Sequence, residues 1–178
     1  MKRELLSFGG NFLDKKVAIL GGSTTKDITE ILELFLLKNN IKPAFYESEF
    51  GQYWEDAIFD NPILEEFSPD LFYIHTSNRN LQHYPSPSSS KKEIDQSLSN
   101  EFTRYEKMWD SLRKKYGCLV IQNNFELPFF RILGNLDSVD FRGRTNYILK
   151  LNSMFATYAE NNADLIINDI NYLSASFG

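Results

Sequence analysis

The sequence predicts an α/β fold, a three-layer α/β/α sandwich around a five-stranded parallel sheet. Short apolar runs alternate along the chain with amphipathic helical patterns, and this alternation is typical of a parallel sheet covered by helices on both faces. The runs are continuously apolar, as expected for strands buried on both sides. A length of 178 residues fits one domain of ordinary size. We therefore expect residues 1–178 to form a single domain.

The first predicted helix lies between the first and second of the five predicted strands. We expect a helix that begins near Thr25 or Lys26, after a run of hydroxyl side chains that can cap its free amides. Its apolar residues repeat with the 3.6-residue period of a helix. The predicted strands span residues 16–20, 41–46, 70–75, 118–121 and 165–168, and the apolar stripe of the helix is Ile28, Ile31, Leu32, Phe35 and Leu36.

Two further helices are indicated later in the chain. Ser90 and Glu93 have the spacing of a capping box and predict the start of a long helix, which Gly117 ends. The Pro- and Ser-rich segment 82–90 before it predicts an exposed, mobile loop. The apolar stripes are Ile94, Leu98, Phe102, Tyr105, Trp109 and Leu112 in the long helix, and Ile148, Leu151, Phe155 and Tyr158 in the helix before the fifth strand.

Charge and composition argue against several classes of partner. The net charge is −5 and the two signs are interspersed, so no basic stripe predicts nucleic-acid binding. No stretch approaches the ~20 apolar residues of a membrane span, and the N-terminus lacks the apolar region of a signal peptide. The single cysteine, Cys118, lies in an apolar run and is expected to be a small buried hydrophobe. We expect a cytoplasmic protein with no membrane partner.

Polar residues follow each predicted strand, where open α/β sheets bind their ligands. The loop Gly21–Thr25 puts small residues at a strand-to-helix turn, where free amides and the positive end of the helix can hold an anion or a developing oxyanion. A structural turn with a hydroxyl cap explains the loop equally well. The spacing of a phosphate-binding P-loop is missing. The corresponding segments elsewhere are Glu47–Gly51, Thr76–Arg79, Gln122–Asn124 and Asp169.

The first strand and its loop carry a family resemblance. Val17-Ala-Ile-Leu-Gly-Gly-Ser23 resembles the first sequence block of SGNH hydrolases, with Gly-Gly-Ser in place of Gly-Asp-Ser. This resemblance implies an SGNH-hydrolase/flavodoxin-like fold. It also implies roles for single residues: Ser23 is placed like the nucleophile, Asp169 like the aspartate of the final block, and Gly22, Gly51 and Asn78 like oxyanion or substrate-binding groups.

The final block departs from the SGNH pattern at the general base. It reads Asp169-Ile-Asn-Tyr172, with tyrosine where the family has histidine. A serine hydroxyl is a poor nucleophile without a base, and loss of a triad member typically costs several orders of magnitude in rate. His75, at the end of the third predicted strand, is a substitute candidate for the base, whereas His83 lies in the 82–90 loop. An ordinary hydrogen-bonded or solvent-facing histidine is the alternative for both, so whether the domain is an enzyme stays open.

A second resemblance covers nearly the whole chain. Leu20–Thr25, Tyr46–Tyr53 and Ile121–Pro128, extended by Arg131–Asn135 and Arg142–Arg144, resemble the N-terminal SGNH-like domain of FkbH-like proteins of the haloacid dehalogenase superfamily, subfamily IIIC. In such proteins a haloacid dehalogenase-type domain follows, and the better understood members load a glyceryl unit from a phosphorylated donor onto an acyl-carrier protein. The Asp-x-Asp-x-Thr/Val motif of that domain is missing here, so we expect no metal or other cofactor in this domain and magnesium only in the absent one.

The segment after the fourth predicted strand points to recognition of an anion. Asn123, Asn124 and Arg131 supply amide and guanidinium groups suited to a phosphate or carboxylate. Arg142 is a further candidate. The alternative is that Arg131 and Arg142 pair with Asp137 or Asp140 and brace a long loop.

Three functions are compatible with these patterns. The first is a substrate- or acyl-carrier-binding domain for acyl or glyceryl transfer in polyketide or surface-polysaccharide biosynthesis, working on an acyl or phosphorylated small molecule with a haloacid dehalogenase-type domain in cis. The second is an SGNH-type esterase or O-acyltransferase with Ser23 as nucleophile and Gly51 and Asn78 stabilising the oxyanion. The third is a structural or dimerising domain. The sequence identifies neither the substrate nor the pathway.

Overall fold

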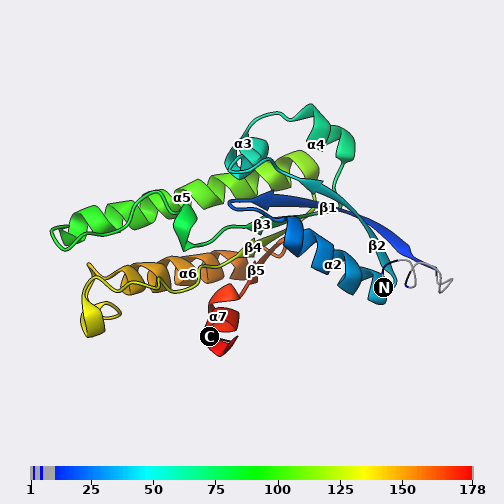
Figure 1. Cartoon of the computed structure of the whole chain (residues 1–178). Coiled ribbons are helices and arrows are strands. Elements are labelled where there is room, and N and C mark those ends of the chain that lie inside the picture. The colour runs from blue at the N-terminus through cyan, green and yellow to red at the C-terminus, as the bar shows by residue number, and fades with distance from the viewer. Residues whose placement is uncertain (1, 3–4, 6–10, 178) are drawn as a thin grey trace.

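The computed structural model describes residues 2, 5 and 11–177 (Figure 1). Five strands form one sheet in the order β2-β1-β3-β4-β5, and every neighbouring pair is parallel. The predicted α/β architecture with a five-stranded parallel sheet is therefore confirmed. The strands are β1 (Leu13–Gly21), β2 (Ile41–Glu47), β3 (Leu71–His75), β4 (Leu119–Asn123) and β5 (Leu165–Asn168).

Helices cover the sheet, with α3 and α5 on one side of β1 and β2 and α2 on the other (Figure 1). Within the described residues, no helix combines the length and the apolar character that a membrane crossing requires. The helices are α2 (Lys26–Lys38), α3 (Tyr53–Ile58), α4 (Pro62–Phe67), α5 (Lys91–Tyr116), α6 (Arg144–Glu160) and α7 (Ile170–Phe177), with short 3-10 turns η1 (Asn78–Asn80) and η2 (Gly134–Leu136).

The strand order fixes where a ligand can bind. The chain runs from β1 outward to β2 and then crosses back to β3 on the other side of β1. In open α/β sheets, ligands usually bind at such a reversal, beyond the carboxyl ends of the two strands, here β1 and β3. Gly21 at the end of β1 pairs with His75 at the end of β3. The loops that follow these two residues therefore form the centre of the candidate site.

Large aromatic side chains fill the core on the α5 and α6 side of the sheet. Trp109 and Tyr105 of α5 lie 4.8 Å and 5.1 Å, ring centre to ring centre, from Phe155 of α6, and all three are fully buried. Phe72 and Val120 of the sheet belong to the same cluster. The aromatic residues Tyr105, Trp109 and Phe155, predicted from the helical stripes, are thus part of this core.

Both predicted ends of the long helix are confirmed. The Ser90 hydroxyl accepts the Glu93 amide at 3.3 Å, while the Glu93 carboxylate accepts the Ser90 amide at 2.7 Å, so two free amides of the first turn of α5 are satisfied. At the other end Gly117 adopts φ 61°, a left-handed conformation that glycine tolerates best.

Three local predictions need correction. Strand β1 begins at Leu13 rather than at residue 16, because its first residues are polar or exposed yet still pair with β2. In the 82–90 loop Pro85 is buried and Tyr84 is half-buried, since the Tyr84 hydroxyl donates to the Asn78 carbonyl at 3.0 Å. Cys118 is half-buried rather than buried, and burial raises the pKa of its thiol to about 11.

Candidate functional site

The turn after β1 is held by the two neighbouring strands. The Gly22 amide donates to the His75 carbonyl at 2.9 Å, and the Gly21 amide donates to the Ser48 hydroxyl at 2.9 Å. These bonds tie the turn to the ends of β3 and β2. The backbone amides of Gly21 and Gly22 are therefore engaged within the fold.

The hydroxyl side chains of this turn have different surroundings. Thr25 is buried and donates to the Glu47 carboxylate at 2.7 Å, which fixes the entry to α2. Ser23 is exposed, and across residues 11–177 its hydroxyl makes no hydrogen bond. The sequence placed Ser23 at this strand-to-helix turn, and the structure leaves its hydroxyl facing solvent.

The amide side chain that contacts the turn is Asn80, which the sequence analysis missed. Its Nδ2 donates to the Gly22 carbonyl at 2.9 Å, and its Oδ1 accepts the Ser77 amide at 2.9 Å. A Cβ on Gly22 would overlap this amide group, so a larger residue there would displace the Asn80 side chain. The spacing of Ser77 and Asn80 is that of a capping box, and this was the signal that could have found Asn80.

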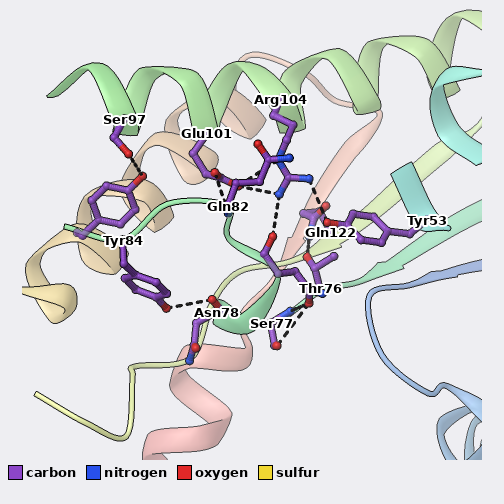
Figure 2. A network of polar contacts seen from close by, with 12 residues as sticks. Tyr53, Thr76, Ser77, Asn78, Gln82, Tyr84, Ser97, Glu101, Arg104 and Gln122 are labelled. Carbon is purple, nitrogen blue, oxygen red and sulfur yellow. Dashed lines mark hydrogen bonds and ion pairs between the residues drawn. The ribbon is translucent and has the colours of Figure 1, made fainter. Parts of the chain in front are cut away.

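The predicted oxyanion groups Asn78 and Gly51 make no hydrogen bond to the turn within residues 11–177. Instead, the Asn78 side chain donates to the Glu126 carboxylate at 2.8 Å, and its backbone amide faces the same carboxylate at 3.3 Å. Figure 2 shows Asn78 beside Ser77 and Tyr84 on the loop after β3. Gly51 is exposed in the loop after β2, with φ 78°. Their assignment as oxyanion groups stays a prediction.

His75 belongs to a polar cluster at the ends of β3, β4 and β5. The Asn123 side-chain amide donates to His75 Nδ1 at 2.9 Å, while Asn123 Oδ1 accepts from the Tyr73 hydroxyl at 3.1 Å and from Asn168 Nδ2 at 2.7 Å. With Nδ1 as acceptor, a neutral imidazole carries its proton on Nε2. Neither ring nitrogen is then free to take a proton from a hydroxyl. Burial also lowers the pKa of His75, which favours the neutral form.

Asp169 and Asn124 are brought together, but at the start of α7. Asp169 Oδ1 accepts from the Asn124 side chain at 2.8 Å and from the Tyr172 amide at 3.1 Å, and Asn124 Oδ1 accepts the Asn171 amide at 3.0 Å. These bonds satisfy amides of the first turn of α7. The Tyr172 side chain, at the position of the family's histidine, is 65% exposed. None of these bonds involves Ser23.

The two arginines of the long loop differ. Arg142 binds Asp140 through two bonds of 2.9 Å and 2.8 Å, so the predicted alternative of a loop-bracing pair is what the structure contains. These hydrogen bonds lower the pKa of Asp140 to about 2. Arg131 is exposed and has no side-chain partner among the described residues.

A buried ion pair fixes the loop after β3 onto α5 (Figure 2). Arg104 donates to Glu101 at 2.7 Å and to the Asn80 carbonyl at 3.0 Å, and Glu101 accepts the Gln82 amide at 3.2 Å. Arg104 also donates to the Tyr53 hydroxyl of α3 at 3.0 Å. The loop that carries Asn78 and Asn80 is thereby anchored to α5 as well as to the turn.

A hollow of about 540 Å³ opens next to Asn78, between the loops that follow β3 and β4. Neither the hollow nor any other part of the described chain contains a group of three or more His, Cys, Asp or Glu side chains placed to hold a metal ion. The hollow is lined by Asn78, Arg79, Tyr84, Glu126, Phe129 and Arg144, among others.

Comparison with family models and with curated proteins gives no match. Among solved structures, the N-terminal part of the protein BF1531 from Bacteroides fragilis, which contains a phosphatase domain complexed with Mg, superposes with a TM-score of 0.81 at 18% identity. The similarity covers 99% of this chain and 46% of that chain. TesA has a TM-score of 0.51 at 11% identity over 83% of this chain and 74% of its own. The acetyl xylan esterase AlAXEase has a TM-score of 0.51 at 14% identity over 88% of this chain and 78% of its own. At these identities the similarity concerns the fold, and the chain has the SGNH-hydrolase/flavodoxin-like α/β fold that the sequence resemblance implied.

Proposed function

We propose that this chain is a substrate-binding SGNH-like domain of the FkbH-like type, which holds an acyl or phosphorylated small molecule at the carboxyl edge of its sheet. The bound group is passed to an acyl-carrier protein in polyketide or surface-polysaccharide biosynthesis. A haloacid dehalogenase-type domain in the same polypeptide performs the phosphoryl chemistry. Two findings support this: the sequence resemblance over nearly the whole chain, and the fold shared with BF1531 across 99% of it.

One observation favours a binding function over a catalytic one: in the described part of the chain, Ser23 has no hydrogen-bonded base. The Ser23 hydroxyl is exposed and has no hydrogen-bonded base within residues 11–177, and the Nδ1 atom of His75 is already occupied by Asn123. Without a base, an alcohol at neutral pH is a weak nucleophile. The loops around it are nevertheless rigidly built, with Asn80 fixing Gly22. A site that is ordered but lacks a proton acceptor is suited to holding a ligand.

The test is a chemical-shift titration of the nitrogen-15-labelled chain with phosphopantetheine, a carrier arm that combines a phosphate and an amide-rich tail. We expect saturable shifts at the amides of residues 21–25 and 76–80. The Ser23→Ala variant is expected to bind more weakly but to keep the same set of shifted amides. Absence of saturable shifts in both segments would contradict the proposed function.

An esterase or O-acyltransferase is the second candidate, and the solvent-facing Ser23 hydroxyl at the strand-to-helix turn favours it. Hydrolysis of 4-nitrophenyl acetate separates the two functions. If the binding function is correct, the chain and its Ser23→Ala variant give equal rates, both close to that of buffer. A rate that depends on Ser23 would establish the enzyme instead.

A further inference from the structure

Two arginines of the hollow next to Asn78 have no carboxylate partner. Arg79 is exposed, and among residues 11–177 its side chain makes neither a hydrogen bond nor an ion pair. Arg104, Arg113 and Arg142, in contrast, each bind a carboxylate at 2.7–2.8 Å. Within the described residues, therefore, neither guanidinium group of the hollow forms an ion pair with a carboxylate.

The surroundings of Arg144 indicate that its guanidinium is available to a ligand. Its guanidinium stacks over the ring of Tyr84, with 5.0 Å between the guanidinium carbon and the ring centre. Its Nε atom is buried and has no hydrogen-bond partner in the described part of the chain. A buried donor without an acceptor is unfavourable, because burial has removed its hydrogen bond to water. Across residues 11–177 no other side-chain nitrogen of Arg144 has a hydrogen-bond partner either, so the guanidinium keeps donors for a ligand oxygen in the hollow that it lines.

Glu126 makes the charge in the hollow uneven, negative near Asn78 and positive near the arginines. It lines the same space, but its carboxylate accepts from the Asn78 side chain and backbone and makes no ion pair with either arginine. An anionic group of a ligand is therefore attracted towards Arg79 and Arg144 and repelled from the Asn78 side.

Two aromatic side chains form the outer wall of the hollow. Phe129 and Phe130 are 92% and 74% exposed, and their rings meet edge to face at 4.9 Å. Exposed aromatic rings next to unpaired arginines are a combination suited to ligands that are apolar at one end and anionic at the other. In the free protein the apolar surface of these rings is exposed to water, and such a ligand would cover it.

We infer that this hollow is the substrate subsite of the domain, and that its ligand class is a small amphipathic anion. Arg79 and Arg144 bind the phosphate or carboxylate head, and Phe129 and Phe130 cover a short apolar or acyl portion. This assignment rests on the proposed function, since it gives the substrate class of that same carboxyl-edge site. Arg79 and Arg144 lie in segments that the sequence singled out, but no role in anion binding was expected of either residue.

The probe is phenyl phosphate, titrated into the nitrogen-15-labelled chain, with inorganic phosphate as a head-only control and benzyl alcohol as a neutral control. We expect saturable shifts at the amides of residues 78–79, 126–127, 129–130 and 144. Phosphate should bind more weakly at the same amides, and benzyl alcohol should shift only residues 127, 129 and 130. Benzoate in place of phenyl phosphate tells whether the head preference is for phosphate or carboxylate.

Variants separate the two halves of the subsite. Arg79→Gln and Arg144→Gln are expected to weaken phenyl phosphate binding about 10- to 100-fold, while Lys107→Gln, which removes an exposed positive charge on α5, leaves it unchanged. Phe130→Ala should weaken phenyl phosphate but not inorganic phosphate, with Phe35→Ala as the matched exposed control on α2. Arg144→Lys keeps the positive charge and should retain part of the affinity. It therefore serves as a control for a loss of binding in Arg144→Gln that comes from misfolding.

The outcomes distinguish this subsite from the proposed function. Shifts confined to residues 21–25, with none at 126–130 or 144, would overturn the subsite and leave carboxyl-edge binding intact. Shifts at neither segment would count against both. Equal affinity of the chain, Arg79→Gln and Arg144→Gln would also overturn the subsite, because an anion held there must respond to the loss of its charge partners.

Discussion

Asn80 shows how a single side chain can join two loops of the candidate site. Its amide bridges the Gly22 carbonyl and the Ser77 amide, both at 2.9 Å. Asn80→Ala leaves both backbone groups without this partner, so we expect the free energy of unfolding to fall by about 1–3 kcal/mol. Urea denaturation measures the change. Asn100→Ala, which removes an exposed amide on α5, should cost far less, and equal losses for the two variants would refute the bridging role.

The titration of His75 tests the polar cluster that surrounds it. Burial lowers the pKa of this imidazole, so its resonances should titrate with a midpoint below about 6.5, and His75→Gln identifies them. Since the folded chain binds this proton more weakly than the unfolded chain does, protonation destabilises the fold. Stability linked to His75 is therefore constant above neutral pH and declines as the pH falls from about 6.5 towards the folded pKa. A midpoint at or above the unfolded value would mean that the cluster is not formed as described.

For single residues, the sequence predicted where a side chain lies better than it predicted which side chain it binds. It located Ser23 on the turn after β1 and the polar residues at the strand ends, because a strand followed by small or polar residues is a local pattern. It did not show that Asn124 would bind Asp169, 45 residues away, or that Asn123 would occupy Nδ1 of His75. Such pairs depend on which strands become neighbours, and no local pattern records that.

Among the elements, those with a full amphipathic stripe were predictable and the short ones were not. Helices α5 and α6 each bury several residues at helical spacing, which made their stripes visible. Helices α3 and α4 have six residues each, less than two full turns, and α7 buries none. Strand β4 extends to Asn123, two polar residues beyond the predicted run, because Gln122 bonds Trp109 and Thr76 inside the core.

The long loop between β4 and α6 depends on one buried carboxylate. Asp137 accepts the Thr145 amide at 2.7 Å and the Leu133 amide at 3.2 Å, and a Cβ on Gly143 would overlap its backbone carbonyl. It therefore satisfies an orphan amide in the first turn of α6 while closing the loop that carries Phe129. This explains how an irregular segment can hold a wall of the hollow.

Asp137→Asn is expected to lower the free energy of unfolding by about 1–3 kcal/mol near neutral pH, since one oxygen acceptor becomes a donor facing an amide. Burial alone would raise the pKa of Asp137, but the hydrogen bonds from the backbone amides of Thr145 and Leu133 hold it below its usual value. A lowered pKa stabilises the fold above the unfolded pKa of about 3.9 and ceases to do so as the pH falls through the folded pKa. The difference between the chain and Asp137→Asn should therefore shrink below about pH 4, as measured by urea unfolding at several pH values. Glu30→Ala, an exposed carboxylate of α2, serves as the control, and a difference that is the same at every pH would contradict this account.

For the whole molecule, α5 links the core to the site. Its inward face contributes Trp109 and Tyr105 to the aromatic core, while Glu101 and Arg104 on the same helix hold the loop after β3 and the Tyr53 hydroxyl of α3. This pair is nearly removed from water, with side-chain exposures of 2% for Glu101 and 10% for Arg104. The position of the site loop is thereby coupled to the packing of the sheet and its helices.

A double-mutant cycle on this pair tests the coupling. Arg104→Met leaves the buried Glu101 carboxylate unpaired, so we expect it to cost about 3–5 kcal/mol of unfolding free energy. Adding Glu101→Gln should recover part of that loss, which corresponds to a coupling energy of about 1–3 kcal/mol. The exposed pair Lys91 and Asp95 on the same helix, 3.1 Å apart, is the matched control and should couple by only about 0.3–0.5 kcal/mol.

Hydrogen exchange adds the readout that concerns the site. If the ion pair positions the loop, Arg104→Met should speed exchange at the Asn80 and Gln82 amides more than at the strand amides of β4. Uniform acceleration along the chain would show that the pair contributes to stability alone. Equal coupling in the buried and exposed pairs would show that burial adds nothing to the interaction. Acceleration confined to the loop after β3 would mean that α5 transmits the order of the core to the residues around Gly22.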